Sequence, residues 1–229
     1  MRVPFQTAGT GERHSCAPRR HDSVWLHPDW AAHLASPLDA AAQAAVAGWC
    51  AAGRPLVTAR RQPGDAAATL RLGLALPTCD GRRRIGLHLD TAAVARVAPP
   101  PPLAAALVAA PPAWREALAA LAAAAAGLGV DCRVYGSLAW QFLSGAEYLR
   151  PASDVDLLLA ADVWPALERL LGRLAETTVP RLDGEVLLPD GDAVAWRELA
   201  ARPARVLVKG PDRVGFRSHA GVIAAFGGA

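Results

Sequence analysis

Four consecutive prolines, at positions 99–102, interrupt this chain of 229 residues. Proline fixes its own φ and has no backbone N–H, so the run cannot lie inside a helix or a central strand and favours an extended spacer. We therefore expect a linker here, between an N-terminal domain over residues 20–98 and a larger domain over residues 103–229. Residues 1–19 are expected to be a flexible leader, because Gly, Thr, Arg and Pro make up much of this segment.

Hydrophobic periodicity predicts both helices and strands. In the N-terminal domain, alternation at a period of two is typical of strands in a small antiparallel sheet, and one helix is expected over residues 28–50. These strands are expected over residues 56–61, 70–76 and 84–89. In the C-terminal domain, helices are expected over residues 113–128, 138–143, 163–175 and 193–200. Strands are expected there over residues 130–135, 155–159, 178–188 and 205–209. This mixture predicts an α+β (mixed α/β) fold.

The composition argues against several classes of protein. Hydrophobic residues make up 52% of the chain, but much of this fraction is alanine, and no long run of bulky apolar residues suits a membrane span. We expect no membrane association and a cytoplasmic protein, because the first residues lack the apolar segment of a secretory signal. The net charge is only +3, so nucleic acid is not an expected partner.

The charge is divided unequally between the two parts of the chain. Residues 1–102 carry 12 arginines and 7 acidic residues, whereas residues 103–229 carry 12 basic and 14 acidic residues. Arginines in the first part are therefore available for an anionic carrier protein or a CoA-type ligand. The carboxylates of the second part are available for a metal ion.

Asp154 and Asp156 are the most informative acidic residues. They alternate at the start of an expected strand, so their side chains share one face, while Val155 and Leu157 turn to the core. A divalent cation such as Mg²⁺ relieves the repulsion between two carboxylates and usually shares its coordination sphere with substrate phosphates. The pair predicts a metal-dependent phosphoryl or nucleotidyl transfer site, although an Asp-x-Asp pair alone is often a solvated strand edge.

Gly136 and Ser137 stand between an expected strand and an expected helix. Glycine has no Cβ to obstruct a phosphate, and a helix N-terminus favours anions, so this pair is expected to bind substrate. A Gly-Ser pair alone is a common turn. The order of strand, Gly-Ser, helix and then Asp-x-Asp favours the functional interpretation.

Three further residues are candidates for substrate binding. Arg150 and Ser153 flank the aspartates, where each can contact a phosphate, or equally cap or fix the loop. Lys209 ends an expected strand, where its ammonium can meet a phosphate, although a solvated lysine is the more common outcome there.

Two runs carry a resemblance to a known family: VYGSLAWQ over residues 134–141 and YLRPASDVDLL over residues 148–158. They resemble the nucleotidyltransferase domain of the malonate decarboxylase holo-acyl-carrier-protein synthases. These are phosphoribosyl-dephospho-CoA transferases of the polymerase-β-like superfamily. The similarity covers nearly everything after residue 19, including Arg20-His21-Asp22 and the run RLDGEV over residues 181–186.

The resemblance implies a particular reaction. Phosphoribosyl-dephospho-CoA would pass from 2'-(5''-triphosphoribosyl)-3'-dephospho-CoA to a serine of the malonate decarboxylase apo acyl carrier protein, with release of pyrophosphate. Residues 103–229 would be the nucleotidyltransferase-like catalytic domain, with Mg²⁺ (or Mn²⁺) held by Asp154 and Asp156. A third catalytic carboxylate is expected on a following strand, where Asp183 and Glu185 share a face by alternation. Glu185 is favoured because it lies deeper in an apolar run.

Two other functions are compatible with the same residues. The first is a nucleotidyltransferase that uses ATP or another NTP to modify a protein or a small molecule, because the two aspartates do not contact the base. The second is a non-catalytic module that binds a carrier through the basic N-terminal domain. Retention of both Asp154 and Asp156 argues against the second, because a binding module has no need of a metal pair.

Overall fold

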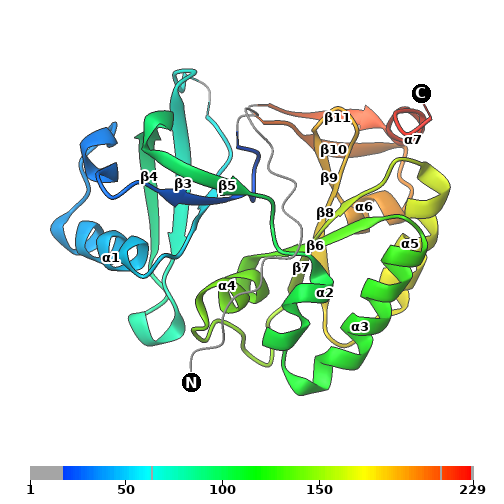
Figure 1. Ribbon diagram of the computed structural model, residues 1–229. Helices are drawn as coiled ribbons and strands as arrows, with labels where there is room; N and C mark the ends of the chain where they lie inside the picture. The colour runs from blue at the N-terminus through cyan, green and yellow to red at the C-terminus, as the bar shows by residue number, and fades with distance from the viewer. Residues whose placement is uncertain (1–17, 63, 212, 228–229) are drawn as a thin grey trace.

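The N-terminal domain is built on a five-stranded antiparallel sheet with the strand order β4-β3-β2-β1-β5 (Figure 1). The computed structural model describes residues 18–62, 64–211 and 213–227, so most of the expected leader lies outside the described residues. The small antiparallel sheet predicted from the sequence is confirmed. Its strands are β1 (Ser23–Leu26), β2 (Leu56–Thr58), β3 (Thr69–Ala75), β4 (Arg84–Asp90) and β5 (Val94–Ala98).

Two of these strands, β1 and β5, were not expected from the sequence. β1 has only four residues, too few for a clear alternation. β5 is an edge strand with three exposed residues in the middle of its five, so its sequence has no buried stripe. Both strands are defined by pairing with each other and, for β1, with β2.

One face of this sheet packs with helix α1 (Ala40–Ala51) into the N-terminal core. Alternate leucines of β3 and β4 are buried there with Trp49, and each buried leucine contributes roughly 1.5–3 kcal/mol. The helix expected over residues 28–50 is wrong in its first part. α1 begins at Ala40, where the Asp39 carboxylate caps it by accepting a hydrogen bond of 2.7 Å from the Ala42 N–H. Residues 28–39 instead contain the 3-10 helix η1 (Trp30–His33) and an isolated β-bridge at Leu34. The other 3-10 helices of this domain, η2 (Thr78–Asp80) and η3 (Thr91–Ala93), follow α1.

The C-terminal domain contains a six-stranded sheet with the order β11-β10-β9-β8-β7-β6. Only β7 and β8 run parallel, and helix α5 (Trp164–Glu176) makes the crossover between them. A parallel pair brings the starts of both strands to the same edge of the sheet, and this edge carries the candidate site. The strands are β6 (Asp131–Tyr135), β7 (Val155–Ala160), β8 (Leu182–Leu187), β9 (Ala193–Ala195), β10 (Arg205–Lys209) and β11 (Val214–Ser218).

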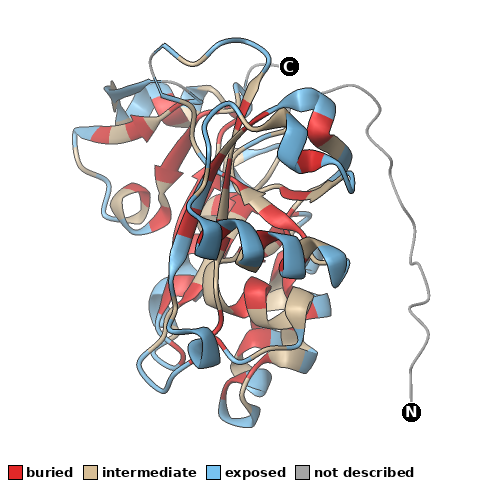
Figure 2. Ribbon diagram, turned by 90° about the vertical axis from the view of Figure 1, so that its left-hand side faces the viewer, coloured by how far each residue is buried: buried red, intermediate tan, exposed pale blue. Residues whose placement is uncertain are grey.

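Helices cover one face of this sheet and bury the main core between them and the strands (Figures 1 and 2). Their outer surfaces are exposed, while the residues that face the sheet are buried (Figure 2). None of the described helices is long and apolar enough to cross a membrane. The remaining helices are α2 (Leu103–Ala106), η4 (Leu107–Ala109), α3 (Pro112–Gly127), α4 (Gly136–Ser144), α6 (Trp196–Ala200) and α7 (His219–Ala224).

Most elements expected in the C-terminal domain are confirmed, with two corrections. The strand expected over residues 178–188 is shorter, because β8 begins at Leu182. The helix expected over residues 193–200 is wrong in its first three residues, which form β9. Hydrogen bonding to β8 on one side and to β10 on the other outweighs the helix propensity of these alanines. β11, α2 and α7 were not expected.

The proline run connects β5 to α2 and lies against strand β6. Pro100 and Pro101 are buried. The Val134 N–H donates to the Pro101 carbonyl at 2.8 Å, and Arg133 donates to the Pro100 carbonyl at 2.9 Å. The prolines are thus packed and hydrogen-bonded, rather than forming a free spacer.

The two domains also share packed side chains. Trp140 of α4 and Tyr148 are part of the N-terminal core, where Trp140 meets Trp49 edge to face with the ring centres 5.7 Å apart. The Tyr148 hydroxyl donates to the Ala75 carbonyl at 2.8 Å, and Arg82 donates to the Tyr148 carbonyl at 2.6 Å. These contacts set the position of one sheet against the other.

Candidate active site

The expected aspartates lie at the start of β7. Asp156 and Asp183 are directly paired in the parallel ladder of β7 and β8, so their side chains share a face, with strands about 4.8 Å apart. Val155 and Leu157 are fully buried on the opposite face, as the alternation predicted. Asp154 immediately precedes the strand. Its carboxylate accepts a hydrogen bond of 2.7 Å from Arg181, a residue that the sequence reasoning did not select.

The environment of Asp156 disfavours its charged form. Burial raises the pKa of this carboxyl to about 6, and the negative charges of Asp154, Asp183 and Glu185 act in the same direction. A cation beside this carboxylate would offset both effects.

The Gly-Ser pair adjoins this carboxylate. Helix α4 begins at Gly136, whose φ is +64°, and a Cβ at this position would lie 2.0 Å from Oδ2 of Asp156. Only glycine therefore lets the backbone approach the carboxylate this closely. Ser137, next along the helix, is half-buried. The fold thus brings together the two motifs that the sequence analysis singled out.

Glu185, the favoured third carboxylate, is engaged by basic residues. It is only 4% exposed, and its oxygens accept hydrogen bonds from Arg20 at 2.7 and 2.9 Å and from Lys209 at 3.1 Å. His21 Nε2 lies 3.2 Å from Oε2. Burial alone would raise the pKa of Glu185, but the His21 hydrogen bond, the charge and hydrogen bonds of Arg20 and the Lys209 hydrogen bond outweigh it and hold the pKa at about 2.

Asp183, the other alternative for this position, faces Asp156 and is exposed. The Gly184 N–H donates to its carboxylate at 2.8 Å. Gly184 is itself required by the pairing of the strands, since a Cβ there would lie 2.0 Å from the Leu157 carbonyl oxygen. Of the two acidic residues on this face of β8, Asp183 is the one that stands opposite the Asp-x-Asp pair.

Arg150 and Ser153 close the loop that leads to Asp154. The Arg150 N–H donates to the Ser153 hydroxyl at 2.9 Å, and the Ser153 N–H donates to the Arg150 carbonyl at 2.9 Å. Ser153 therefore fixes the loop, the alternative that the sequence left open. The side chain of Arg150 is exposed on the same loop.

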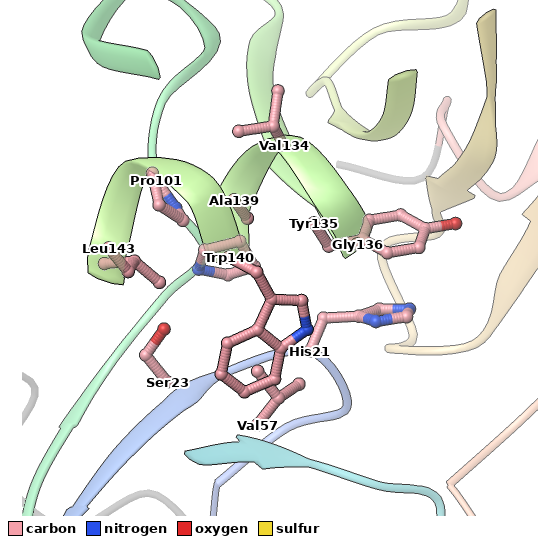
Figure 3. Close-up of a pocket in the computed structure, with 11 residues that line it drawn as sticks. His21, Ser23, Val57, Pro101, Val134, Tyr135, Gly136, Ala139, Trp140 and Leu143 are labelled. Carbon is pink, nitrogen blue, oxygen red and sulfur yellow. The ribbon is translucent and has the colours of Figure 1, made fainter. Parts of the chain in front are cut away.

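The N-terminal domain reaches this face of the sheet through residues 20 and 21. The His21 ring stacks on Tyr135 with the ring centres 3.9 Å apart (Figure 3). Burial lowers the pKa of His21, the Glu185 hydrogen bond opposes that effect, and the charge of Arg20 lowers the pKa further. The two rings border a small, mostly apolar pocket between the domains, which Gly136 and Trp140 also line (Figure 3). The only sequence signal for this contact was the Arg20-His21-Asp22 run.

The acidic residues of this site suit a metal ion that is shared with a substrate, rather than one held by the protein alone. Within the described ranges, no group of three or more His, Cys, Asp or Glu side chains is placed to hold a metal by itself. Mg²⁺ does not require such a group, because it is commonly bound by one or two carboxylates together with substrate phosphates. Asp154 and Asp156 fit that role, since Arg181 engages only Oδ2 of Asp154 and since burial, together with the neighbouring negative charges, raises the pKa of Asp156, effects that a cation would offset.

The comparisons with known proteins place this two-domain α+β fold, with its carboxylates beside a Gly-Ser helix start, among the transferase enzymes. The chain belongs to the phosphoribosyl-dephospho-CoA transferase family. The model of the MdcG N-terminal domain of this family matches residues 19–100, and the model of the MdcG C-terminal domain matches residues 102–220.

Curated relatives share this description. A phosphoribosyl-dephospho-CoA transferase of Xanthomonas campestris pv. campestris (strain 8004) is 42% identical over 196 residues, which cover 84% of this chain and 91% of the relative. The protein of the same name from Bradyrhizobium diazoefficiens is 40% identical over 201 residues, covering 86% of this chain and 88% of the relative. That of Pseudomonas putida (strain W619) is 32% identical over 197 residues, covering 84% and 90%. No solved structure is significantly similar to this chain.

Proposed function

We propose that this protein transfers the phosphoribosyl-dephospho-CoA group from 2'-(5''-triphosphoribosyl)-3'-dephospho-CoA to a serine of the malonate decarboxylase apo acyl carrier protein. Membership of the phosphoribosyl-dephospho-CoA transferase family supports the identity of the transferred group. The observation that carries the chemistry is the contact between Asp156 and the glycine that begins α4, because it joins a carboxylate pair to a helix N-terminus that favours anions.

In this reaction the serine Oγ of the carrier attacks the α-phosphorus of the triphosphate. A new P–O bond to serine forms, the α–β phosphoanhydride bond breaks, and pyrophosphate leaves with the electron pair. The backbone N–H groups of Gly136 and Ser137 bind phosphate oxygens, and the exposed Arg150 is available to the substrate from the neighbouring loop. Asp183, exposed and opposite Asp156, accepts the serine proton.

Mg²⁺ or Mn²⁺ bound by Asp154 and Asp156 would neutralise charge on the phosphate oxygens and on the leaving group. Arg181 holds the Asp154 carboxylate by Oδ2, which leaves Oδ1 to the cation. Ser153 keeps the preceding loop in the conformation that presents Asp154.

The test is a transfer assay. The full-length protein is incubated with apo carrier, triphosphoribosyl-dephospho-CoA and Mg²⁺, and the intact mass of the carrier is measured. We expect a mass increase equal to the prosthetic group, which D154N and D156N abolish. D162N is the matched control, because Asp162 is an exposed aspartate that follows the same strand.

An unchanged carrier mass with the wild-type protein would refute the proposal. Modification of the carrier with ATP in place of the dephospho-CoA compound would support the NTP-dependent alternative. Carrier binding that survives both D154N and D156N, without any transfer by the wild-type protein, would support a binding module.

A further inference from the structure

Glu185 is a buried carboxylate whose hydrogen-bond partners join three separate segments of the chain. Arg20 and His21 come from the N-terminal domain, Glu185 lies on β8, and Lys209 ends β10. A buried charge requires this kind of compensation, because the loss of its hydration is costly. The cluster therefore connects the first domain to the central strands of the second.

The cluster carries more positive than negative charge. One carboxylate faces the guanidinium of Arg20 and the ammonium of Lys209, while burial of His21 favours the neutral form of its ring. The side chains of Arg20 and Lys209 are each 35% exposed. Among the residues that the structure describes, Glu185 engages only Nη1 of Arg20, which leaves Nε and Nη2 as donors for another acceptor, together with further protons of the Lys209 ammonium.

The partly exposed cations are linked through Glu185 to the strand that carries Asp183. Glu185 is two residues beyond Asp183 on the same face of β8, which corresponds to about 6.6 Å along the strand. A second link runs through His21, which stacks on Tyr135, and Tyr135 pairs with Asp156 in the β6–β7 ladder. A ligand that contacts the aspartates can therefore extend along the sheet to the two cations.

We propose that Arg20 and Lys209 bind the polyphosphate end of the substrate, the part that leaves as pyrophosphate, and that Glu185 is the positioning residue that holds both cations. This inference rests on the proposed function. As the α–β bond breaks, the electron pair passes to the leaving pyrophosphate, and the guanidinium and ammonium groups stabilise its growing charge. The N-terminal domain thereby supplies part of the transfer site through Arg20.

The same chemistry would suit the internal pyrophosphate of the dephospho-CoA part, so the experiment uses two probes. Binding of inorganic pyrophosphate and of dephospho-CoA is measured by calorimetry, with Mg²⁺ present, for the wild-type protein and for R20M and K209M. R83M is the matched control, because Arg83 forms an exposed ion pair of 2.6 Å with Asp39 in the N-terminal domain. Each substitution at the cluster leaves the other cation with Glu185, and thermal denaturation verifies that the variants are folded.

We expect R20M and K209M each to weaken pyrophosphate binding about tenfold or more, since each removes charged hydrogen bonds. Binding of dephospho-CoA and the behaviour of R83M should be unchanged. Unchanged pyrophosphate binding in both variants would overturn the proposal. Weakened binding of dephospho-CoA alone would also overturn it, because the cations would then serve the other end of the substrate.

The role of Glu185 has its own measurement. E185Q should weaken pyrophosphate binding even though it removes a negative charge, because the cations lose the group that aligns them, and E185D should restore part of the affinity. Tighter binding by E185Q would instead mean that Glu185 only neutralises the cations. These results do not depend on transfer to a carrier: failure of the wild-type transfer assay refutes the proposed function, whereas the pyrophosphate affinities decide the role of the cluster.

Discussion

The contact between Gly136 and Asp156 permits a sharp test with G136A. The structure gives two separate costs. An alanine in the left-handed conformation, at φ +64°, costs about 1–2 kcal/mol, and its Cβ would lie 2.0 Å from Oδ2 of Asp156, so the carboxylate must move. Movement of a reacting group by about 1 Å can lower a rate about 100-fold. We therefore expect transfer to fall about 100-fold, with a modest loss of stability.

The matched control is G145A. Gly145 ends the same helix at φ +71°, but an added Cβ there would meet nothing within 4 Å. In both variants the left-handed conformation of the new alanine should lower the free energy of unfolding by about 1–2 kcal/mol. This corresponds to a fall of roughly 2–8 °C in Tm for a chain of this size. Only G136A should lose activity. Initial rates of carrier modification and thermal denaturation provide the two measurements, and a transfer rate for G136A within about threefold of that for G145A would refute the reasoning.

Three further predictions concern stability and reactivity. G184A should lower the free energy of unfolding by more than about 3 kcal/mol, measured as a fall in the denaturant midpoint, because its Cβ would lie 2.0 Å from the Leu157 carbonyl oxygen, which belongs to the paired strand and cannot turn aside. The pKa of Glu185 is held at about 2, well below its ordinary value of 4.5, so its contribution to stability, up to about 3 kcal/mol, is present above pH 4.5 and is lost as pH falls towards 2. E185Q should remove that part of the acid dependence in unfolding experiments. Burial raises the pKa of the Cys50 thiol to about 11, so iodoacetamide should modify Cys50 more slowly than the exposed Cys79, as peptide mass mapping would measure.

Each of these three predictions would be refuted by a particular result. A denaturant midpoint for G184A close to the wild-type value would mean that β7 and β8 can separate at little cost. An acid unfolding curve that is the same for E185Q and wild type would mean that the basic residues do not stabilise the ionised carboxylate. Equal alkylation rates for Cys50 and Cys79 would contradict the burial of Cys50.

Local features were readable from the chain. Period-two alternation was sufficient for β3 and β4, because each strand has one buried face, and the Asp154-Val155-Asp156 alternation correctly separated the core from the opposite face of β7. The glycine at 136 was likewise recognisable from its place between a strand and a helix, where the backbone takes a φ of +64° that favours glycine, although its contact with Asp156 was not. In each case neighbours along the chain carry the information.

The assignment among the remaining acidic residues was not readable in this way. Alternation placed Asp183 and Glu185 on one face of β8, and the choice of Glu185 as the third carboxylate depended only on its position deeper in the apolar run. The pairing of β7 with β8 sets Asp183 opposite Asp156, and Arg20 meets Glu185 across 165 positions of sequence. Such contacts depend on how the first domain packs against the second sheet. The sequence by itself therefore determines which residue types lie at each strand and turn. The partners of a charged side chain, and hence its pKa and its role, depend on strand pairing and on the packing of the domains.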